Sequence, residues 1–117
     1  MPTFEMLRRE SDIRSFKRGE VIFKEGDAAD CMFAVVDGEV EINFRGAVIE
    51  RCTPVSVFGE MALIDRHPRS ATAIAAVDCR LAAIDEKRFL RLVEQVPRFA
   101  LQMMQLISER LRRTTAR

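Results

Sequence analysis

One short stretch of the 117-residue chain gathers groups that bind anions, residues 57–73, V-F-G-E-M-A-L-I-D-R-H-P-R-S-A-T-A. Gly59 allows the backbone to approach a ligand closely. Residues 60–63 are long enough for one helical turn, whose first amides have no internal partner and favour an anion. Arg69 begins an apolar strand, where a guanidinium is costly to bury unless an anion pairs with it. Its planar fork fits a phosphate, and Ser70 adds a hydroxyl beside it.

Glu60 gives this anion site a second specificity. A carboxylate beside a phosphate is repelled unless it faces a hydroxyl. In a 3′,5′-cyclic nucleotide only the ribose 2′-OH remains free, so Glu60 would accept from that hydroxyl while Arg69 holds the phosphate. We expect the two side chains to pair with each other when no ligand is present. The alternative is a surface Glu60–Arg69 ion pair without a ligand, which contributes little to stability.

Composition narrows the function class. The chain is 48% hydrophobic and 32% charged, with a formal net charge of +1. These values indicate one folded domain over residues 1–117 and argue against nucleic-acid or membrane binding by bulk charge. No apolar run approaches the roughly 20 residues of a membrane span, and the N-terminus carries no signal pattern. We therefore expect a cytoplasmic protein with no membrane partner and no nucleic-acid contact from this segment.

The cysteines and the single histidine argue against a metal or disulfide framework. The three cysteines, Cys31, Cys52 and Cys79, are widely spaced and form no C-x-x-C motif. A His-rich metal site cannot be built, because His67 is the single histidine. We interpret the cysteines as small buried apolar residues and expect no metal. The same scarcity of acid–base and metal-binding groups argues against a hydrolase or isomerase on a cupin-type barrel. We therefore expect a protein that is not an enzyme.

The elements that must position this site are mostly short strands. Strand-like apolar runs cover residues 21–23, 32–36, 40–44, 47–49, 71–77 and 81–84. Asp37-Gly38 between two such runs is the strongest hairpin signal, and many short strands indicate a sandwich or barrel. Thr3 is a candidate N-cap for a short helix, and residues 86–93 and 97 to about 115 have helical periodicity.

The last helix is apolar over more than one face. Ala100, Met104, Ile107 and Leu111 follow a 4-3-4 spacing in addition to the residues that would pack on the domain. We expect this surplus to form the seam of a homodimer through residues 97–115. The alternative is that the whole helix is buried in its own domain.

The motif F-G-E-M-A-L-I-x-x-x-P-R-S-A-T-A closely resembles the phosphate-binding cassette of cyclic-nucleotide-binding domains. Residues 16–42 resemble the first half of that family's β-roll, and the closing helices resemble its hinge and cap helices, so the resemblance covers nearly the whole chain. It implies a mainly β fold with flanking helices. That fold is an antiparallel, jelly-roll-like β-roll over about 14–84, with a short N-terminal helix and hinge and cap helices over about 86–115.

The resemblance also implies a role for each residue of the site. Glu60 would hold the ribose 2′-OH and Arg69 the cyclic phosphate, with the cassette amides and Ser70 completing the cradle. Thr114 and Thr115 stand where a Thr-Ser pair reaches the base in catabolite-activator-type members. The implied ligand-binding residues are Phe58, Gly59, Glu60, Met61, Ala62, Arg69, Ser70, Thr114 and Thr115.

Two positions depart from the family pattern. Residues 52–56 lack the glycine that usually stands in the turn before the cassette. Ser70 leaves the choice between cAMP and cGMP open, and we favour cAMP. We thus predict a regulatory domain that binds a cyclic nucleotide and couples binding to movement of its C-terminal helices. The alternative is a structural dimerisation module of the same fold that has lost its ligand. Whether the chain is a complete sensor or part of a longer regulator stays open.

Overall fold

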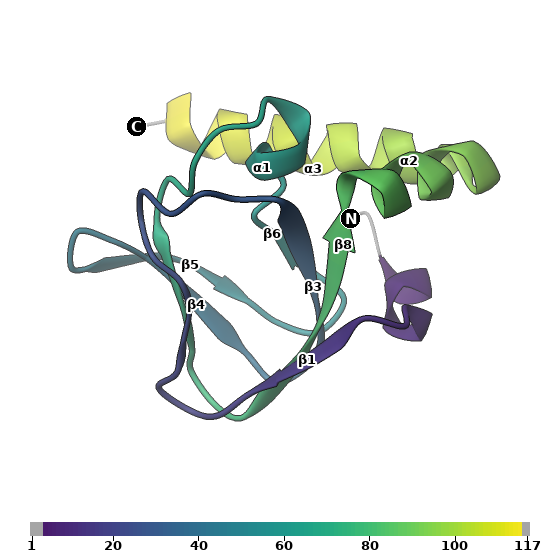
Figure 1. Cartoon of the computed structure of the whole chain (residues 1–117). Coiled ribbons are helices and arrows are strands. Elements are labelled where there is room, and N and C mark those ends of the chain that lie inside the picture. Colours follow the sequence, from purple (N-terminus) through teal and green to yellow (C-terminus); the bar gives the residue numbers. More distant parts are fainter. Residues whose placement is uncertain (1–3, 116–117) are drawn as a thin grey trace.

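The computed structural model describes residues 4–115, with side chains through Arg113. Eight antiparallel strands form two four-stranded sheets (Figure 1). The first sheet contains, in order, β1 (Ile13–Phe16), β8 (Cys79–Asp85), β3 (Cys31–Asp37) and β6 (Val57–Phe58). The second contains β2 (Val21–Phe23), β7 (Thr72–Ala75), β4 (Val40–Phe44) and β5 (Ala47–Cys52). The predicted jelly-roll-like β-roll is confirmed, and β1 and β6 are strands that the apolar runs did not indicate.

Strand β3 separates two hydrophobic cores. Residues 31–36 are all buried, and successive side chains of a strand point to opposite faces. Cys31, Phe33 and Val35 belong to the cluster between the two sheets. The alternate residues, Met32, Ala34 and Val36, belong to the cluster under the helices. A continuous apolar run is therefore the pattern that this doubly covered strand requires.

The hairpin predicted at Asp37-Gly38 is wrong. Strands β3 and β4 belong to different sheets, so this turn is a corner at which the chain changes sheet. Gly38 is required there because a Cβ would lie 2.5 Å from the Cβ of Cys79. The hairpin between β4 and β5 is instead closed by Arg45-Gly46, and both residues have positive φ, as a type I′ turn needs.

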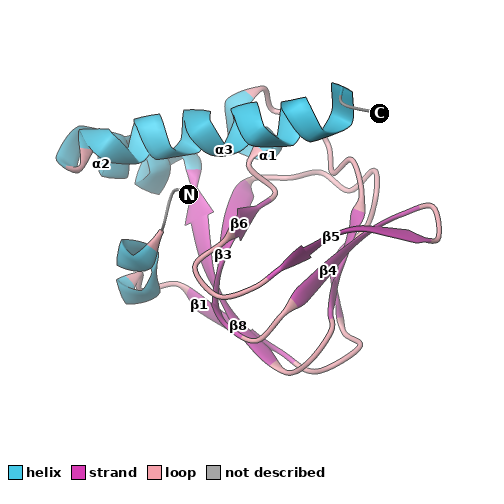
Figure 2. Ribbon diagram, turned by 180° about the vertical axis from the view of Figure 1, so that it is seen from behind, coloured by secondary structure: helices cyan, strands magenta, loops and turns pink. Residues whose placement is uncertain are grey.

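Helices cover one end of the roll, and Figures 1 and 2 both show α3 extending across it. They are the α-helices α1 (Met61–Ile64), α2 (Glu86–Gln95) and α3 (Pro97–Thr115), while the 3₁₀ helix η1 (Glu5–Arg9) lies beside the roll and leads into β1. Phe99 of α3 packs edge-on against Phe4 and Phe89, and Glu10 binds Arg88 through two hydrogen bonds. The N-terminal segment, α2 and α3 are thus tied together. The N-cap predicted at Thr3 lies outside the described residues.

The turn before the cassette adopts a left-handed conformation without glycine. Val55 has φ 65°, a region that is strained for a β-branched side chain. Its amide donates to the carbonyl of Val35, and the amide of Ser56 donates to the carbonyl of Thr53. The tight turn at the family's glycine position therefore forms here at some cost in backbone strain, about 1–2 kcal/mol.

Burial of Cys52 should make the folded state less stable as the pH rises into the alkaline range. The residue is 1% exposed, and burial raises the pKa of its thiol from 9.0 to about 12. Between those values the folded state keeps a proton that the unfolded state releases, so stability falls as pH rises, by about 1.4 kcal/mol per pH unit. We expect wild type to lose roughly 2 kcal/mol more than Cys52→Ala between about pH 8 and 10.5 in urea unfolding. Equal losses would contradict this assignment.

Candidate functional site

Seven of the residues predicted from the sequence line one pocket of about 170 Å³. They are Phe58, Gly59, Glu60, Met61, Ala62, Arg69 and Ser70. The end of β6 and the single turn α1 provide the first five, and the segment that leads into β7 provides the other two. Hydrogen bonds to the Gly26–Asp27 turn fix the backbone of Arg69 on both sides: the amide of Gly26 donates to the carbonyl of Arg69, and the amide of Arg69 to that of Asp27.

Arg69 is a buried cation without a carboxylate partner. It is 8% exposed, and burial lowers the pKa of its guanidinium. Nη2 donates to the carbonyl of Cys31 at 2.7 Å and Nη1 to that of Gly59 at 3.2 Å. Among the described residues no carboxylate oxygen lies within 4.0 Å of it, and its buried Nε has no hydrogen-bond partner. A buried charge in this state favours an incoming anion.

Gly59 keeps the backbone close to that guanidinium. Its φ is 76°, and a Cβ would lie 2.6 Å from Nη1 of Arg69. The arginine is held by two carbonyls and cannot move aside without losing them, so only glycine fits here. The expectation that a glycine at this position serves close approach therefore has a geometric basis.

Glu60 does not pair with Arg69 as expected. Its carboxylate accepts a hydrogen bond from Nη1 of Arg110 at 2.7 Å. Nη2 of Arg110 also donates to Glu50 at 2.9 Å and to the carbonyl of Val57 at 2.6 Å. Burial alone would lower the pKa of Arg110, but the two carboxylates outweigh it and the pKa is raised. Glu60 therefore faces the last helix, while Arg69 faces the strands.

Sequence reasoning missed the rest of the pocket wall. The additional lining residues are Phe23, Ile42, Ile49, Glu50, His67, Pro68, Ala71 and Arg110. Arg110 continues the inward-facing series Phe99, Met103 and Leu106 with helical spacing, so a charge in an otherwise apolar stripe was the available signal. Thr114 and Thr115 are in the last turn of α3, but their side chains lie outside the described residues.

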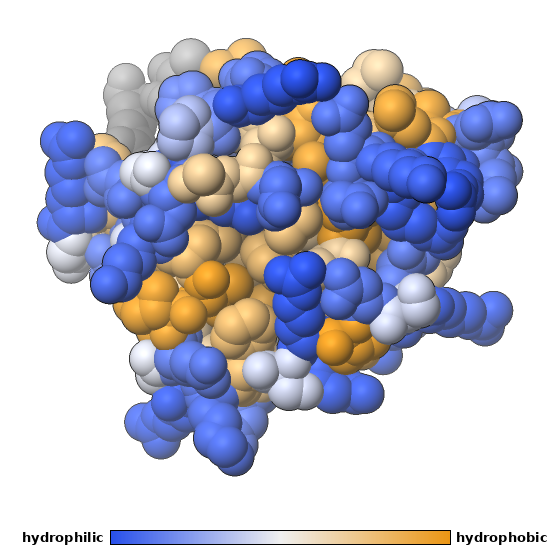
Figure 3. Space-filling view, viewed as in Figure 1, coloured by the Kyte–Doolittle hydropathy of each residue, from blue (hydrophilic) through white to orange (hydrophobic). Residues whose placement is uncertain are grey.

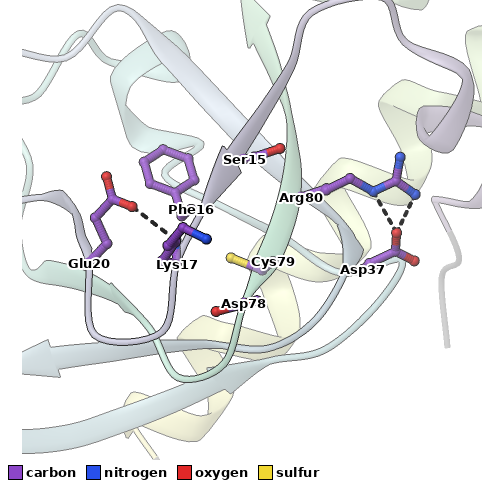
Figure 4. A pocket seen from close by; sticks show the side chains of 8 residues that line it. All are labelled: Ser15, Phe16, Lys17, Glu20, Asp37, Asp78, Cys79 and Arg80. Carbon is purple, nitrogen blue, oxygen red and sulfur yellow. Dashed lines mark hydrogen bonds and ion pairs between the residues drawn. The ribbon is translucent and has the colours of Figure 1, made fainter.

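A larger pocket of about 460 Å³ lies at the opposite end of the roll, between β1, β8 and their turns. Figure 4 shows its charged groups engaged with one another: Arg80 with Asp37, and the carboxylate of Glu20 with the amide of Lys17. Asp78 accepts from the amide of Arg18. Since Arg80 and the three carboxylates of this pocket already have partners, the Glu60–Arg69 pocket is the stronger candidate for ligand chemistry.

Two absences concern residues 4–113, the part of the chain whose side chains the structure describes. No group of three or more histidine, cysteine or acidic side chains is placed to hold a metal ion in this part of the chain. No helix within the described residues has the length and apolar character to cross a membrane.

Comparison with known proteins shows the family of the chain. The profile of the cyclic nucleotide-binding domain matches residues 13–96, which is more than two thirds of the chain. A cyclic AMP receptor protein of Thermus thermophilus is 32% identical over 104 residues, which cover 85% of this chain and 48% of that protein.

Solved structures of related proteins have the same fold as this chain. The crystal structure of the Thermus thermophilus catabolite activator protein matches with a TM-score of 0.85 and 28% identity, covering 96% of this chain and 55% of that one. The cGMP-bound form of the EAL enzyme Bd1971 matches with a TM-score of 0.68 and 32% identity, covering 89% of this chain and 29% of that one.

The chain spans about half the length of the curated regulators that it matches. The profile match, the two-sheet β-roll and the pocket that gathers Gly59, Glu60 and Arg69 all concern this shared half. The chain belongs to the cyclic nucleotide-binding domain family.

Proposed function

We propose that this chain is a cytoplasmic regulatory domain that binds a 3′,5′-cyclic nucleotide in the Glu60–Arg69 pocket. The single observation that carries the proposal is Arg69, a buried guanidinium with no carboxylate partner and a buried Nε without a hydrogen-bond acceptor among the described residues. A cyclic phosphate would supply both the missing charge and the missing acceptor. Glu60 would accept from the ribose 2′-OH.

Binding is proposed to be coupled to α3 through Arg110. The pocket of about 170 Å³ is smaller than the roughly 300 Å³ at which ligand pockets begin. Arg110 forms part of its wall and already engages the Glu60 carboxylate. A ribose at Glu60 must therefore share that carboxylate with α3, and the helix must adjust. Ligand binding would shift the population between positions of the C-terminal helices.

We propose cAMP rather than cGMP as the preferred ligand. The support is the cyclic AMP receptor protein among the relatives, while the EAL enzyme structure with cGMP bound keeps the alternative in view. Ile42 and Ile49 also line the pocket, and we assign them to the apolar surface against which the base stacks. Such a surface favours either purine, so the choice depends on polar groups at the rim.

Calorimetric titration of nucleotide-free protein with cAMP and then cGMP tests the proposal. Saturable binding with a higher affinity for cAMP is the expected result. Comparable affinity for both would leave the sensor function intact and overturn the base preference. No heat with either nucleotide, on protein shown to be folded and free of bound nucleotide, would favour the ligand-free structural module instead.

We also propose that α3 pairs two copies of the chain. Met104 and Leu111 are 63% and 62% exposed, and Leu101 is exposed beside them. Ala100 and Ile107 of the same predicted seam are half-buried. Figure 3 shows apolar side chains at the surface among charged ones over the layer of α2 and α3. The spacing of these residues suits a two-helix seam with a second copy.

A charge in this seam should separate the protomers. We expect Met104→Glu to weaken the dimer by at least about a hundredfold in sedimentation velocity, since two carboxylates would be buried per interface. Leu90→Glu is the matched control, because Leu90 is as exposed but lies on α2. A monomeric wild type at every concentration, or equal weakening by both variants, would refute the seam.

A further inference from the structure

The guanidinium of Arg69 packs on the ring of Phe23. The Cζ atom of Arg69 lies 4.0 Å from the centroid of the Phe23 ring and 5.7 Å from that of Phe33. The first distance is well inside the range for a cation–π contact, which strengthens when both groups are removed from water. Phe23 is the last residue of β2 and lines the candidate pocket.

We propose that Phe23 is a positioning residue for the phosphate-binding arginine, holding the Arg69 guanidinium in the plane in which its N–H groups meet a cyclic phosphate. The inference rests on the proposed function. In this role Phe23 makes no contact of its own with the ligand and acts only through Arg69.

The Phe23 ring and the two backbone carbonyls contact different parts of the Arg69 guanidinium. Hydrogen bonds of a guanidinium lie in its plane, and a ring packed on its face does not compete for them. Two N–H groups of Arg69 are directed to the carbonyls of Cys31 and Gly59. The Nε edge keeps no partner within the described chain. The ring thus compensates part of the buried charge while leaving an edge available to an anion.

The ring is itself held in place. Phe23, Phe33 and Phe58 form a cluster with centroids 5.5–6.1 Å apart. The Phe33 and Phe58 rings are nearly parallel, with 25° between their planes. Both are buried and belong to the core between the sheets. Phe23 is therefore a rigid support. Gly59 lies against both partners of the contact, since a Cβ at this position would lie 3.6 Å from the Phe23 ring and 2.6 Å from Nη1 of Arg69.

The test compares two equivalent truncations. Phe16 and Phe23 are both partly buried and pack against the same core cluster, but Phe16 lies at the other end of the roll. We expect Phe23→Leu to weaken cAMP binding roughly tenfold, a factor between those of an exposed and a fully desolvated cation–π contact. Phe16→Leu should lower the urea midpoint to a similar degree and leave the affinity unchanged.

A second measurement covers the case in which Phe23→Leu does not fold. Stepwise ring fluorination at position 23 keeps the shape and removes the negative face of the ring, so affinity should fall with each added fluorine. A packing role predicts no such series. If wild type binds cAMP and neither Phe23→Leu nor fluorination weakens it, the inference fails while the proposed function stands. If wild type binds no cyclic nucleotide, the proposed function has failed first and the positioning role with it.

Discussion

Replacing Arg69 by methionine is expected to weaken cyclic-nucleotide binding by at least about a hundredfold. The phosphate would enter a site of buried carbonyls and aromatic rings with no cation to meet it. The other arginine that lines this pocket within residues 4–113 is Arg110, whose guanidinium is directed to Glu60, Glu50 and the carbonyl of Val57. Titration calorimetry measures the loss directly, and the rise in melting temperature that ligand gives wild type should disappear with it.

The same variant should keep its stability. Arg69 has no carboxylate within 4.0 Å among the described residues, and burial lowers the pKa of its guanidinium. Removing a desolvated charge is favourable, while the carbonyls of Cys31 and Gly59 lose a donor each. The two effects oppose one another, so the unfolding free energy should stay within about 1 kcal/mol of wild type. Affinity lost without stability lost is the signature of a residue kept for its ligand.

Arg66→Met is the matched control. Arg66 lies in the same loop, but its side chain is 80% exposed and pairs with Glu86 at 3.5 Å. It does not line the pocket, so this variant should bind as wild type does. Undiminished affinity in Arg69→Met, or equal losses in both variants, would contradict the assignment of Arg69 to the phosphate.

The strands with strong apolar character could be predicted from the sequence, and their partners could not. The run over residues 32–36 correctly predicted β3, because a strand covered on both faces needs apolar residues throughout. Which strand it pairs with depends on contacts far apart in sequence. Asp37-Gly38 has the composition of a hairpin turn, yet packing against Cys79 makes it a corner between sheets. Local turn chemistry does not distinguish these two outcomes.

In the site, too, local sequence predicts the residues that lie close together in the chain, while contacts between distant elements determine the rest. Residues that are close in sequence, from Phe58 to Ala62, were found together because one turn positions them. Arg69 is predicted from its charge at the start of an apolar strand, and Ser70 from the hydroxyl beside it. Phe23, Glu50 and Arg110 enter the pocket from distant elements, and the pairing of Glu60 with Arg110 in place of Arg69 is set by how α3 crosses the roll. The charge of Arg110 in the inward-facing stripe of α3 indicates that this arginine has a partner inside the domain, but it does not indicate which residue that partner is.

Arg110→Leu is expected to destabilise the fold by about 2 kcal/mol or more, because it leaves a buried carboxylate without its cation. The Glu60 side chain is 9% exposed and that of Arg110 18% exposed. Cyclic-nucleotide affinity should fall as well, roughly tenfold, since an uncompensated Glu60 repels the nearby phosphate. Urea unfolding and titration calorimetry measure the two effects. Arg110→Lys keeps the charge but not the fork, and should restore part of each.

A double-mutant cycle shows whether the carboxylate is the cause. Glu60→Gln alone should destabilise, because it removes one of the two carboxylates that raise the pKa of Arg110. In the Arg110→Leu background the same change removes the unpaired charge and should recover about 1–2 kcal/mol. Strictly additive effects would mean that the pair does not fasten α3 to the roll. A coupling of the expected sign would place the connection between the ligand-site carboxylate and the helix at Arg110, since Glu60 and the carbonyl of Val57 both bind α3 through its guanidinium. Glu50 binds α3 through Arg110 at 2.9 Å and through Arg113 at 3.8 Å.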